Sequence, residues 1–361
     1  MSRAYDPFAP GPLAVGASTI QAADTARGRL FPVELWYPAR SGPRPGPGPV
    51  RDVPARPGPH PLVVFSHHSG GHRQSSSFVG IHLASHGYVV AAMDHSEVVA
   101  PELAGREGET AAERAARIGA MIAARVPDVR FLLDHLLGGP APGAAVPGGI
   151  ELDPERVGLA GFSFGGWTAL AAPETEARVR AVVALAPAGI PHPRPGVLPL
   201  TLAFGWDRAV PVLCLAAEHD TPIPLDGLRE LFGRVPSPKR MFILRDADHQ
   251  HFVDDVATQH EAVRAMSFSA ETAWLPAGMR PVGELCAPEH AYLFTRGLAL
   301  GHLDAALRQL PEAAGFLDGD VTGALAARGV AALAGTCGSG GMRDDGRDPG
   351  CCTGTSASRK E

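Results

Sequence analysis

The sequence predicts an α/β fold in which a mostly parallel central sheet carries helices on both faces. Short apolar runs of the kind found in buried strands alternate along the chain with segments of helical periodicity. This alternation is typical of parallel sheets, because each crossover between parallel strands needs a helix-length connection. The chain of 361 residues has 45% hydrophobic and 19% charged residues, which allows a sizeable buried core.

The first half of the chain supplies four of the expected strands. They are bounded by Gly, Pro and polar residues, and they cover 13–22, 29–37, 62–66 and 88–93. Residues 41–60 are dense in Pro, Gly and Arg, which predicts an exposed loop. Helical patterns cover 76–86, closed by Gly87, and 110–137. Pro127 divides the second pattern into two parts, and the later part has one apolar face, formed by Val129, Leu132, Leu133 and Leu136.

The second half continues the alternation. Its expected strands cover 156–162, 180–185, 210–217 and 240–244. Residues 253–288 lack strong periodicity, and a helix over 288–310 with a weaker one over 320–334 completes the ordered part. We therefore expect residues 1–335 to form a single domain. Residues 336–361 contain almost nothing apolar, which predicts a disordered tail.

Composition excludes several classes of function. The formal net charge is -6 and no Lys/Arg run is present, so nucleic acid is not an expected partner. Pro and charged residues interrupt every apolar stretch, so no integral membrane segment is expected. The N-terminus shows no signal-peptide pattern. The cysteine count is odd and three lie in the tail, which argues against a disulfide framework and favours a cytoplasmic location: Cys214, Cys286, Cys337, Cys351 and Cys352.

The most informative motif is the G-x-S-x-G pattern at Gly161–Gly165, which is followed by Gly166. It lies between an apolar run and a helix of small residues, the context that makes this motif a nucleophile elbow. The turn should be too tight for side chains at positions 161 and 165, and Gly166 should let the helix approach the sheet. Ser163 would then stand at the tip of the turn as the nucleophile, at the positive end of a helix.

A serine hydroxyl needs a base to activate it, and the base needs an acid that orients it. Such residues follow two later strands, at the sheet edge where the elbow also lies. His249 is the predicted base and Asp220 the predicted acid, in the chain order that this kind of elbow requires. The alternative base is His251. The alternative acids are Glu218 and, less favoured, Asp246 or Asp248.

An oxyanion hole needs two backbone N–H donors. The predicted donors are Phe164, which follows the nucleophile, and Ser69 in the loop after strand 62–66, with His68 as an alternative to Ser69. The histidines of that loop, His67, His68 and His72, do not have the spacing of an HExxH or CxxC frame, so no metal is expected.

These residues resemble the α/β-hydrolase superfamily, and specifically its platelet-activating-factor acetylhydrolase and dienelactone-hydrolase-like branch. The similarity covers roughly Gly11 to Phe252 and is strongest over Pro61–His67 and Gly80–Ala92. It extends to the nucleophile segment Gly161–Gly166 and to His249–Phe252, where it favours His249 over His251. The resemblance implies an α/β-hydrolase fold with a serine triad.

Two positions depart from the pattern of that family. Ala186 stands where the acetylhydrolases place their acid, whereas Ala217–Asp220 resembles the acid segment of bacterial cutinase-like polyester hydrolases. His68 stands where the oxyanion loop of the family usually has Gly, and a positive φ there would strain a histidine.

The expected activity is hydrolysis of a carboxylic ester through an acyl-enzyme on Ser163, with a small-molecule or lipid-like ester as substrate and no cofactor. Hydrolysis of an amide, lactone or thioester by the same triad is an alternative, and a catalytically silent ligand-binding protein is another. Residues 253–310 include large apolar side chains such as Trp274 and Met279 in poorly periodic sequence, so part of this segment is expected to border the pocket. The sequence leaves the oligomeric state open.

Overall fold

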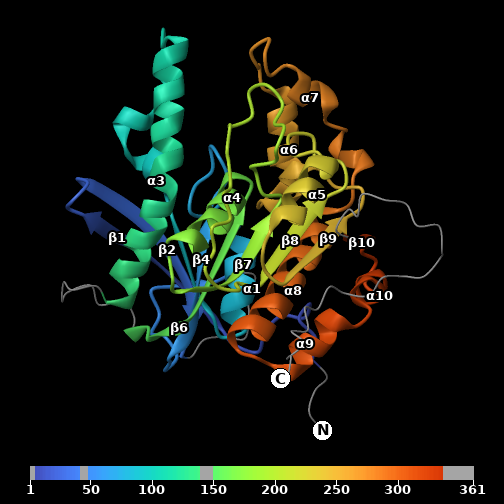
Figure 1. The fold of residues 1–361 in the computed structure, drawn as a ribbon. Helices are drawn as coiled ribbons and strands as arrows, with labels where there is room; N and C mark the ends of the chain where they lie inside the picture. The colour runs from blue at the N-terminus through green and yellow to red at the C-terminus, as the bar shows by residue number, and fades with distance from the viewer. Residues whose placement is uncertain (1–4, 41–47, 139–148, 336–361) are drawn as a thin grey trace, which may run out of the picture.

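The computed structural model describes residues 5–40, 48–138 and 149–335, and the strands of this part form one sheet (Figure 1). The strand order is β10-β9-β8-β7-β6-β4-β5-β2-β1-β3. The strands are β1 (Val15–Asp24), β2 (Arg29–Pro38), β3 (Val50–Arg51), β4 (His60–Ser66), β5 (Val89–Met93), β6 (Leu152–Phe162), β7 (Val179–Leu185), β8 (Val212–Ala217), β9 (Lys239–Leu244) and β10 (Ala332–Gly335). The run from β5 to β9 is parallel, and β2 and β10 join it in antiparallel pairs.

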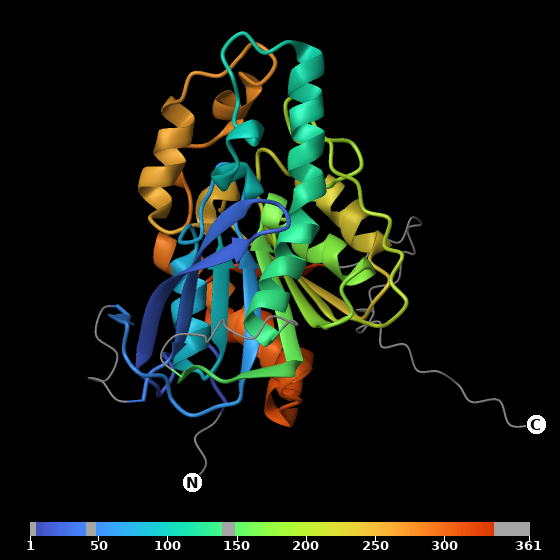
Figure 2. The ribbon, with the colours of Figure 1, turned by 90° about the vertical axis from the view of Figure 1, so that its left-hand side faces the viewer.

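Helices cover both faces of this sheet, as predicted (Figures 1 and 2). One face packs against α3, α4 and α5, and the other against α1, α8 and α10. The α-helices are α1 (Ser77–Ser85), α2 (Ser96–Val99), α3 (Ala111–Leu137), α4 (Phe164–Ala171), α5 (Leu225–Arg234), α6 (Val256–Ala265), α7 (Trp274–Gly278), α8 (Pro288–Leu307), α9 (Pro311–Asp318) and α10 (Val321–Ala326). Short 3₁₀ helices are η1 (Pro101–Leu103), η3 (Ala172–Glu174), η4 (His249–Phe252) and η5 (Val282–Glu284).

The two faces are built by alternate residues of each central strand. In β4, Leu62 and Val64 belong to the core on the α3 side, whereas Val63 and Phe65 belong to the core on the α8 side. Side chains of a strand point alternately to opposite faces, so a continuous apolar run fills both cores at once. This explains why the central strands lack polar alternation in the sequence.

Three local predictions were wrong. Pro127 does not divide the helix: α3 runs without a break from Ala111 to Leu137. A proline removes one backbone hydrogen bond, and the helix continues because its later part packs Val129 and neighbouring residues into the core. The helix expected over 320–334 ends at Ala326, and after Gly329, whose φ is 78°, residues 332–335 pair with β9 as an edge strand. Residues 41–47 of the loop expected over 41–60 lie outside the described residues, and the described remainder contains the two-residue strand β3, which pairs with β1.

The segment after the predicted histidine is helical in places, with α6, α7 and η5. The tail expected over 336–361 lies outside the described residues. Within the ranges that the structure describes, no helix is both long enough and apolar enough to cross a bilayer.

Candidate active site

Ser163 occupies a strained backbone position at the turn between β6 and α4. Its φ is 56° and its ψ is -112°, a region that a residue with a side chain rarely adopts. The turn is held on both sides: the Ser163 N–H donates to the Leu185 carbonyl over 2.9 Å, and its carbonyl accepts from Trp167 and Ala188. The surrounding structure therefore fixes the serine at the tip of the elbow.

The three glycines of the motif are sterically required. A Cβ at Gly161 would lie 2.2 Å from the Gly165 carbonyl oxygen, and a Cβ at Gly165 would lie 1.8 Å from the Ser66 carbonyl oxygen. A Cβ at Gly166 would lie 2.9 Å from Pro187, which follows β7. The helix thus approaches both the sheet and the end of β4 more closely than any side chain permits, in agreement with the expectation from the sequence.

Asp220 and His249 form a direct pair at the same edge of the sheet. Asp220 follows β8 and His249 follows β9, and the carboxylate Oδ2 lies 2.7 Å from the imidazole Nδ1. The other carboxylate oxygen accepts the Ile223 N–H at 2.7 Å. The two side chains are 1% and 9% exposed. Burial raises the pKa of Asp220, and the nearby imidazole opposes that rise.

The imidazole of His249 lies beside the elbow. Its ring centroid is 4.6 Å from that of Phe162, the residue directly before Ser163. The carboxyl ends of β6, β8 and β9 therefore bring the three predicted triad residues to one edge of the sheet, where open α/β sheets hold their sites.

The alternative base has a different environment. His251 is fully buried, and both of its ring nitrogens contact backbone groups. Nδ1 accepts the Asp248 N–H at 3.1 Å, and Nε2 lies 3.3 Å from the Cys286 carbonyl. Burial lowers the pKa of His251. This ring is thus tied into the backbone around it.

The alternative acids make their hydrogen bonds and ion pairs with groups other than the ring of His249. Glu218 accepts hydrogen bonds from Arg245 and from the Asp246 N–H, and Asp246 is exposed. Asp248 is buried and accepts the Thr221 N–H at 3.0 Å and the Thr221 hydroxyl at 3.1 Å. This last contact joins the loop of the predicted acid to the loop of the predicted base.

Asp248 and Thr221 were not assigned this bridging role from the sequence. A signal for it exists, because each directly adjoins a predicted triad residue. The Thr221 hydroxyl also lies 3.4 Å from the Gly278 carbonyl at the end of α7. One point of the segment 253–310 therefore packs beside the acid loop, while a role of this segment in bordering the pocket stays a prediction.

Ala186, which stands where the acetylhydrolase pattern has its acid, has an unusual backbone conformation. Ala186 follows β7 with a φ of 37° and is fully buried. Its N–H donates to the Leu215 carbonyl over 2.7 Å, so its backbone is fixed against β8, the strand that leads to Asp220.

The predicted oxyanion donors lie on two segments that touch. Phe164 is the first residue of α4, and its N–H has no acceptor within its own helix because it belongs to the first turn. Ser69 is exposed in the loop after β4, and in that loop Gly70, with φ 77°, takes the left-handed conformation. His68 is not among the described residues with positive φ, so the strain considered for it does not arise.

Two of the three histidines in this loop contact backbone groups through their rings, whereas the buried Nδ1 of His68 has no hydrogen-bond partner among the described residues. His67 Nδ1 lies 2.7 Å from the His68 carbonyl, and its Nε2 accepts the His95 N–H at 3.2 Å. His72 Nδ1 accepts the Gln74 N–H at 3.2 Å. Burial, helped by the charge of nearby residues, lowers the pKa of His68 to about 3, so this ring is neutral at ordinary pH.

A different cluster has the composition of a metal site. In the part of the chain that the structure describes, Glu218, His219 and Asp246 bring one ligand atom each within 4.8 Å of one another. Glu218 is already bound by Arg245 and by a backbone N–H, so the cluster is a partly exposed polar network at the ends of β8 and β9.

Comparison with known proteins matches the sequence resemblance. The family model described as platelet-activating factor acetylhydrolase, isoform II, matches residues 52–115, which include the loop after β4. The platelet-activating factor acetylhydrolase of Canis lupus familiaris is 26% identical over 232 residues, 56% of this chain and 50% of the relative. That of Cavia porcellus is 50% identical over 38 residues, 10% of this chain and 9% of the relative. The chain thus spans about half the length of the dog protein and far less of the other.

A solved structure supports the fold. The ferulic acid esterase from Streptomyces cinnamoneus aligns with a TM-score of 0.60 and 24% identity, covering 84% of this chain and 93% of that one. The order of the parallel strands, the elbow between β6 and α4, and this likeness lead to one conclusion. The chain has the α/β-hydrolase fold, and its sequence resembles the platelet-activating-factor acetylhydrolase branch of that superfamily.

Proposed function

We propose that the protein is a serine hydrolase that cleaves carboxylic esters through an acyl-enzyme on Ser163. The observation that carries the proposal is the buried Asp220–His249 pair, with its 2.7 Å contact, beside a strained nucleophile elbow. The names of the relatives and of the structural neighbour, an acetylhydrolase and an esterase, favour ester bonds as the substrate class.

In the first half of the proposed reaction, His249 takes the proton of the Ser163 hydroxyl as the serine oxygen attacks the ester carbonyl carbon. The carbonyl oxygen becomes an anion that accepts hydrogen bonds from the Phe164 and Ser69 amides. The tetrahedral intermediate then collapses, and the proton on His249 passes to the leaving alcohol. In the second half, a water molecule repeats the attack on the acyl-enzyme and releases the acid.

The burial of Asp220 gives this pair a catalytic advantage. Burial makes the charged carboxylate costly in the resting state, as the raised pKa indicates. When His249 becomes an imidazolium during attack, it supplies the compensating positive charge 2.7 Å away. The interaction is thus stronger in the transition state than in the ground state, which is the condition for lowering the barrier.

We propose a small-molecule or lipid-like ester as substrate, and the mechanism needs no cofactor. The test is reaction with a fluorophosphonate probe, followed by turnover of p-nitrophenyl esters of graded chain length. The wild-type chain should be labelled at Ser163 and hydrolyse at least one ester, and Ser163→Ala should lose both. Ser269→Ala, which changes an exposed serine of the segment before α7, is the control and should keep both. A wild-type chain that is not labelled, or one labelled at another serine, would refute the proposal.

A further inference from the structure

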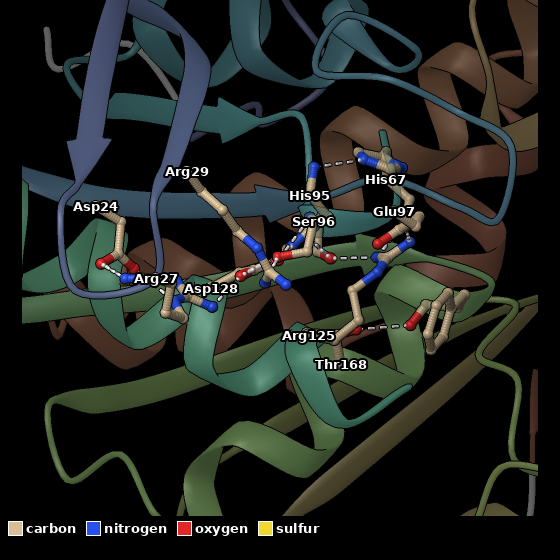
Figure 3. A network of polar contacts seen from close by, with 12 residues as sticks. Asp24, Arg27, Arg29, His67, His95, Ser96, Glu97, Arg125, Asp128 and Thr168 are labelled. Atoms are coloured by element: carbon tan, nitrogen blue, oxygen red, sulfur yellow. Dashed lines mark hydrogen bonds and ion pairs between the residues drawn. The ribbon is translucent and has the colours of Figure 1, made fainter. Parts of the chain in front are cut away.

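Arg125 is a fully buried cation in the middle of α3. Desolvation of a guanidinium is costly unless hydrogen-bond and charge partners replace the lost water. Its charge partner is the Glu97 carboxylate of α2, which forms an ion pair with one guanidinium nitrogen (Figure 3). Burial of this charge costs free energy, and the contacts of Arg125 show which neighbouring groups it holds in position.

The guanidinium contacts both segments that carry the proposed oxyanion donors. One nitrogen donates to the His67 carbonyl at 2.8 Å and lies 3.1 Å from the Ser66 hydroxyl, which fixes the chain directly before His68 and Ser69. The guanidinium carbon lies 3.9 Å from the centre of the Phe164 ring, a distance at which a cation is attracted to the aromatic face. Arg125 therefore joins the loop after β4 to the first residue of α4.

A second set of buried groups contacts Ser66, the last residue of β4 before this loop. The Ser66 hydroxyl lies 2.8 Å from His95 Nε2, and His95 Nδ1 lies 3.3 Å from Asp128 Oδ2. Asp128 also accepts the Ser96 N–H and hydroxyl at 2.8 and 2.7 Å and pairs with Arg27 at 2.6 Å (Figure 3). The contact between Ser66 and His95 restricts the end of β4, and Asp128 in turn contacts the ring of His95.

The serine, histidine and aspartate of this set have the composition of a catalytic triad, but they are enclosed. Ser66 is 3% exposed, and His95 and Asp128 are 0% exposed. No substrate reaches a hydroxyl in such a place, and this hydroxyl already contacts Arg125 and His95. The set is therefore a support for the loop and not a second reaction centre.

We propose that Arg125 is a positioning residue that holds the two oxyanion donors at the spacing required by the tetrahedral intermediate. This inference rests on the proposed ester hydrolysis at Ser163. The donors act on charge that develops only in the transition state, so loss of Arg125 should lower kcat and leave KM nearly unchanged. A residue that merely stabilised the fold would change the melting temperature without this selective effect.

The test removes both partners of the buried ion pair, because removing only one leaves an uncompensated charge. In the double variant Arg125→Met/Glu97→Gln, kcat should fall about 10- to 100-fold and KM should stay within about threefold. Binding of a trifluoromethyl ketone, which forms a tetrahedral adduct with the serine, should weaken in parallel with kcat/KM. The matched control is Arg208→Met, since Arg208 donates to the Pro173 and Glu176 carbonyls away from this loop; it should keep the wild-type kcat.

Phe164→Leu provides a second route if the double variant does not fold. It keeps the backbone N–H of residue 164 and removes the aromatic face under Arg125, so kcat should fall severalfold at constant KM. A folded double variant with kcat within about twofold of wild type, or a Phe164→Leu variant with unchanged kcat, would overturn the inference. Fluorophosphonate labelling of the wild-type chain is measured alongside, because its absence refutes the proposed function and its presence isolates the role of Arg125.

Discussion

Substitution of Gly165 by alanine tests whether the close approach of α4 to β4 sets the geometry of the proposed site. The new Cβ would lie 1.8 Å from the Ser66 carbonyl oxygen and 2.8 Å from that of His67. Real Cβ atoms essentially never approach another heavy atom within 3.0 Å, so helix and strand end must separate by at least about 1.2 Å. Both neighbours are backbone atoms, so no side-chain rotation relieves the clash.

This separation moves Phe164 away from the loop that carries Ser69. A displacement of about 1 Å at a reacting centre can lower the rate about 100-fold, so kcat of Gly165→Ala should fall by about that factor. The assay is p-nitrophenyl ester turnover per fluorophosphonate-reactive site, which removes any unfolded fraction from the result. Circular dichroism then shows whether the fold persists.

The control is Gly119→Ala in α3, where an added Cβ meets nothing within 4 Å. Alanine is favoured over glycine inside a helix, so this variant should gain about 0.5–1 kcal/mol of stability and keep its activity. A Gly165→Ala variant with kcat within about fivefold of wild type would show that the distance between β4 and α4 does not control the reaction.

Three further outcomes are expected. Asp220→Asn should fold and lose about a thousandfold or more in kcat, because the amide selects the wrong imidazole tautomer. The control Glu218→Gln should lose far less. Activity of Asp220→Asn within about tenfold of wild type would exclude Asp220 as the acid. His249→Ala should lose as much activity as removal of the nucleophile, whereas His251→Ala should keep most of it in the folded fraction, and the reverse result would exchange the two roles. Burial lowers the pKa of His302 to about 4, and the unfolded chain takes up this proton at higher pH. The free energy of unfolding should therefore fall by about 3 kcal/mol, for this residue, as the pH is lowered from roughly 6.5 toward 4. Chemical denaturation at these two pH values should show a correspondingly smaller loss for His302→Gln.

The fold and the candidate triad were accessible from the sequence because each depends on local patterns. A G-x-S-x-G motif between a strand and a helix places its own serine, and polar residues directly after buried strands must meet at one sheet edge. The Asp220–His249 contact followed from that logic. Sequence patterns give no distances between side chains, so from the sequence the choice between His249 and His251 depends on the family resemblance. In the structure their hydrogen bonds distinguish the two rings.

The support around Arg125 could not be predicted in the same way. Its contacts with Ser66 and His67 join residues 59 and 58 positions apart, and no local pattern distinguishes this arginine from the others in the helix. The continuity of α3 through Pro127 was likewise not predictable from local sequence. Tertiary packing outweighs the local preference of the proline, and such packing is not a property of any short window of sequence.

Ala186 has a consequence for how the acid of such a site can change place during evolution. It directly follows β7, its backbone is hydrogen bonded to β8, and its φ of 37° lies in a region that aspartate tolerates better than alanine. A carboxylate placed at residue 186 would lie at the end of β7 while Asp220 remains at the end of β8. If Asp220 is the acid, as we propose, the role can pass between neighbouring strands through a form that has two carboxylates.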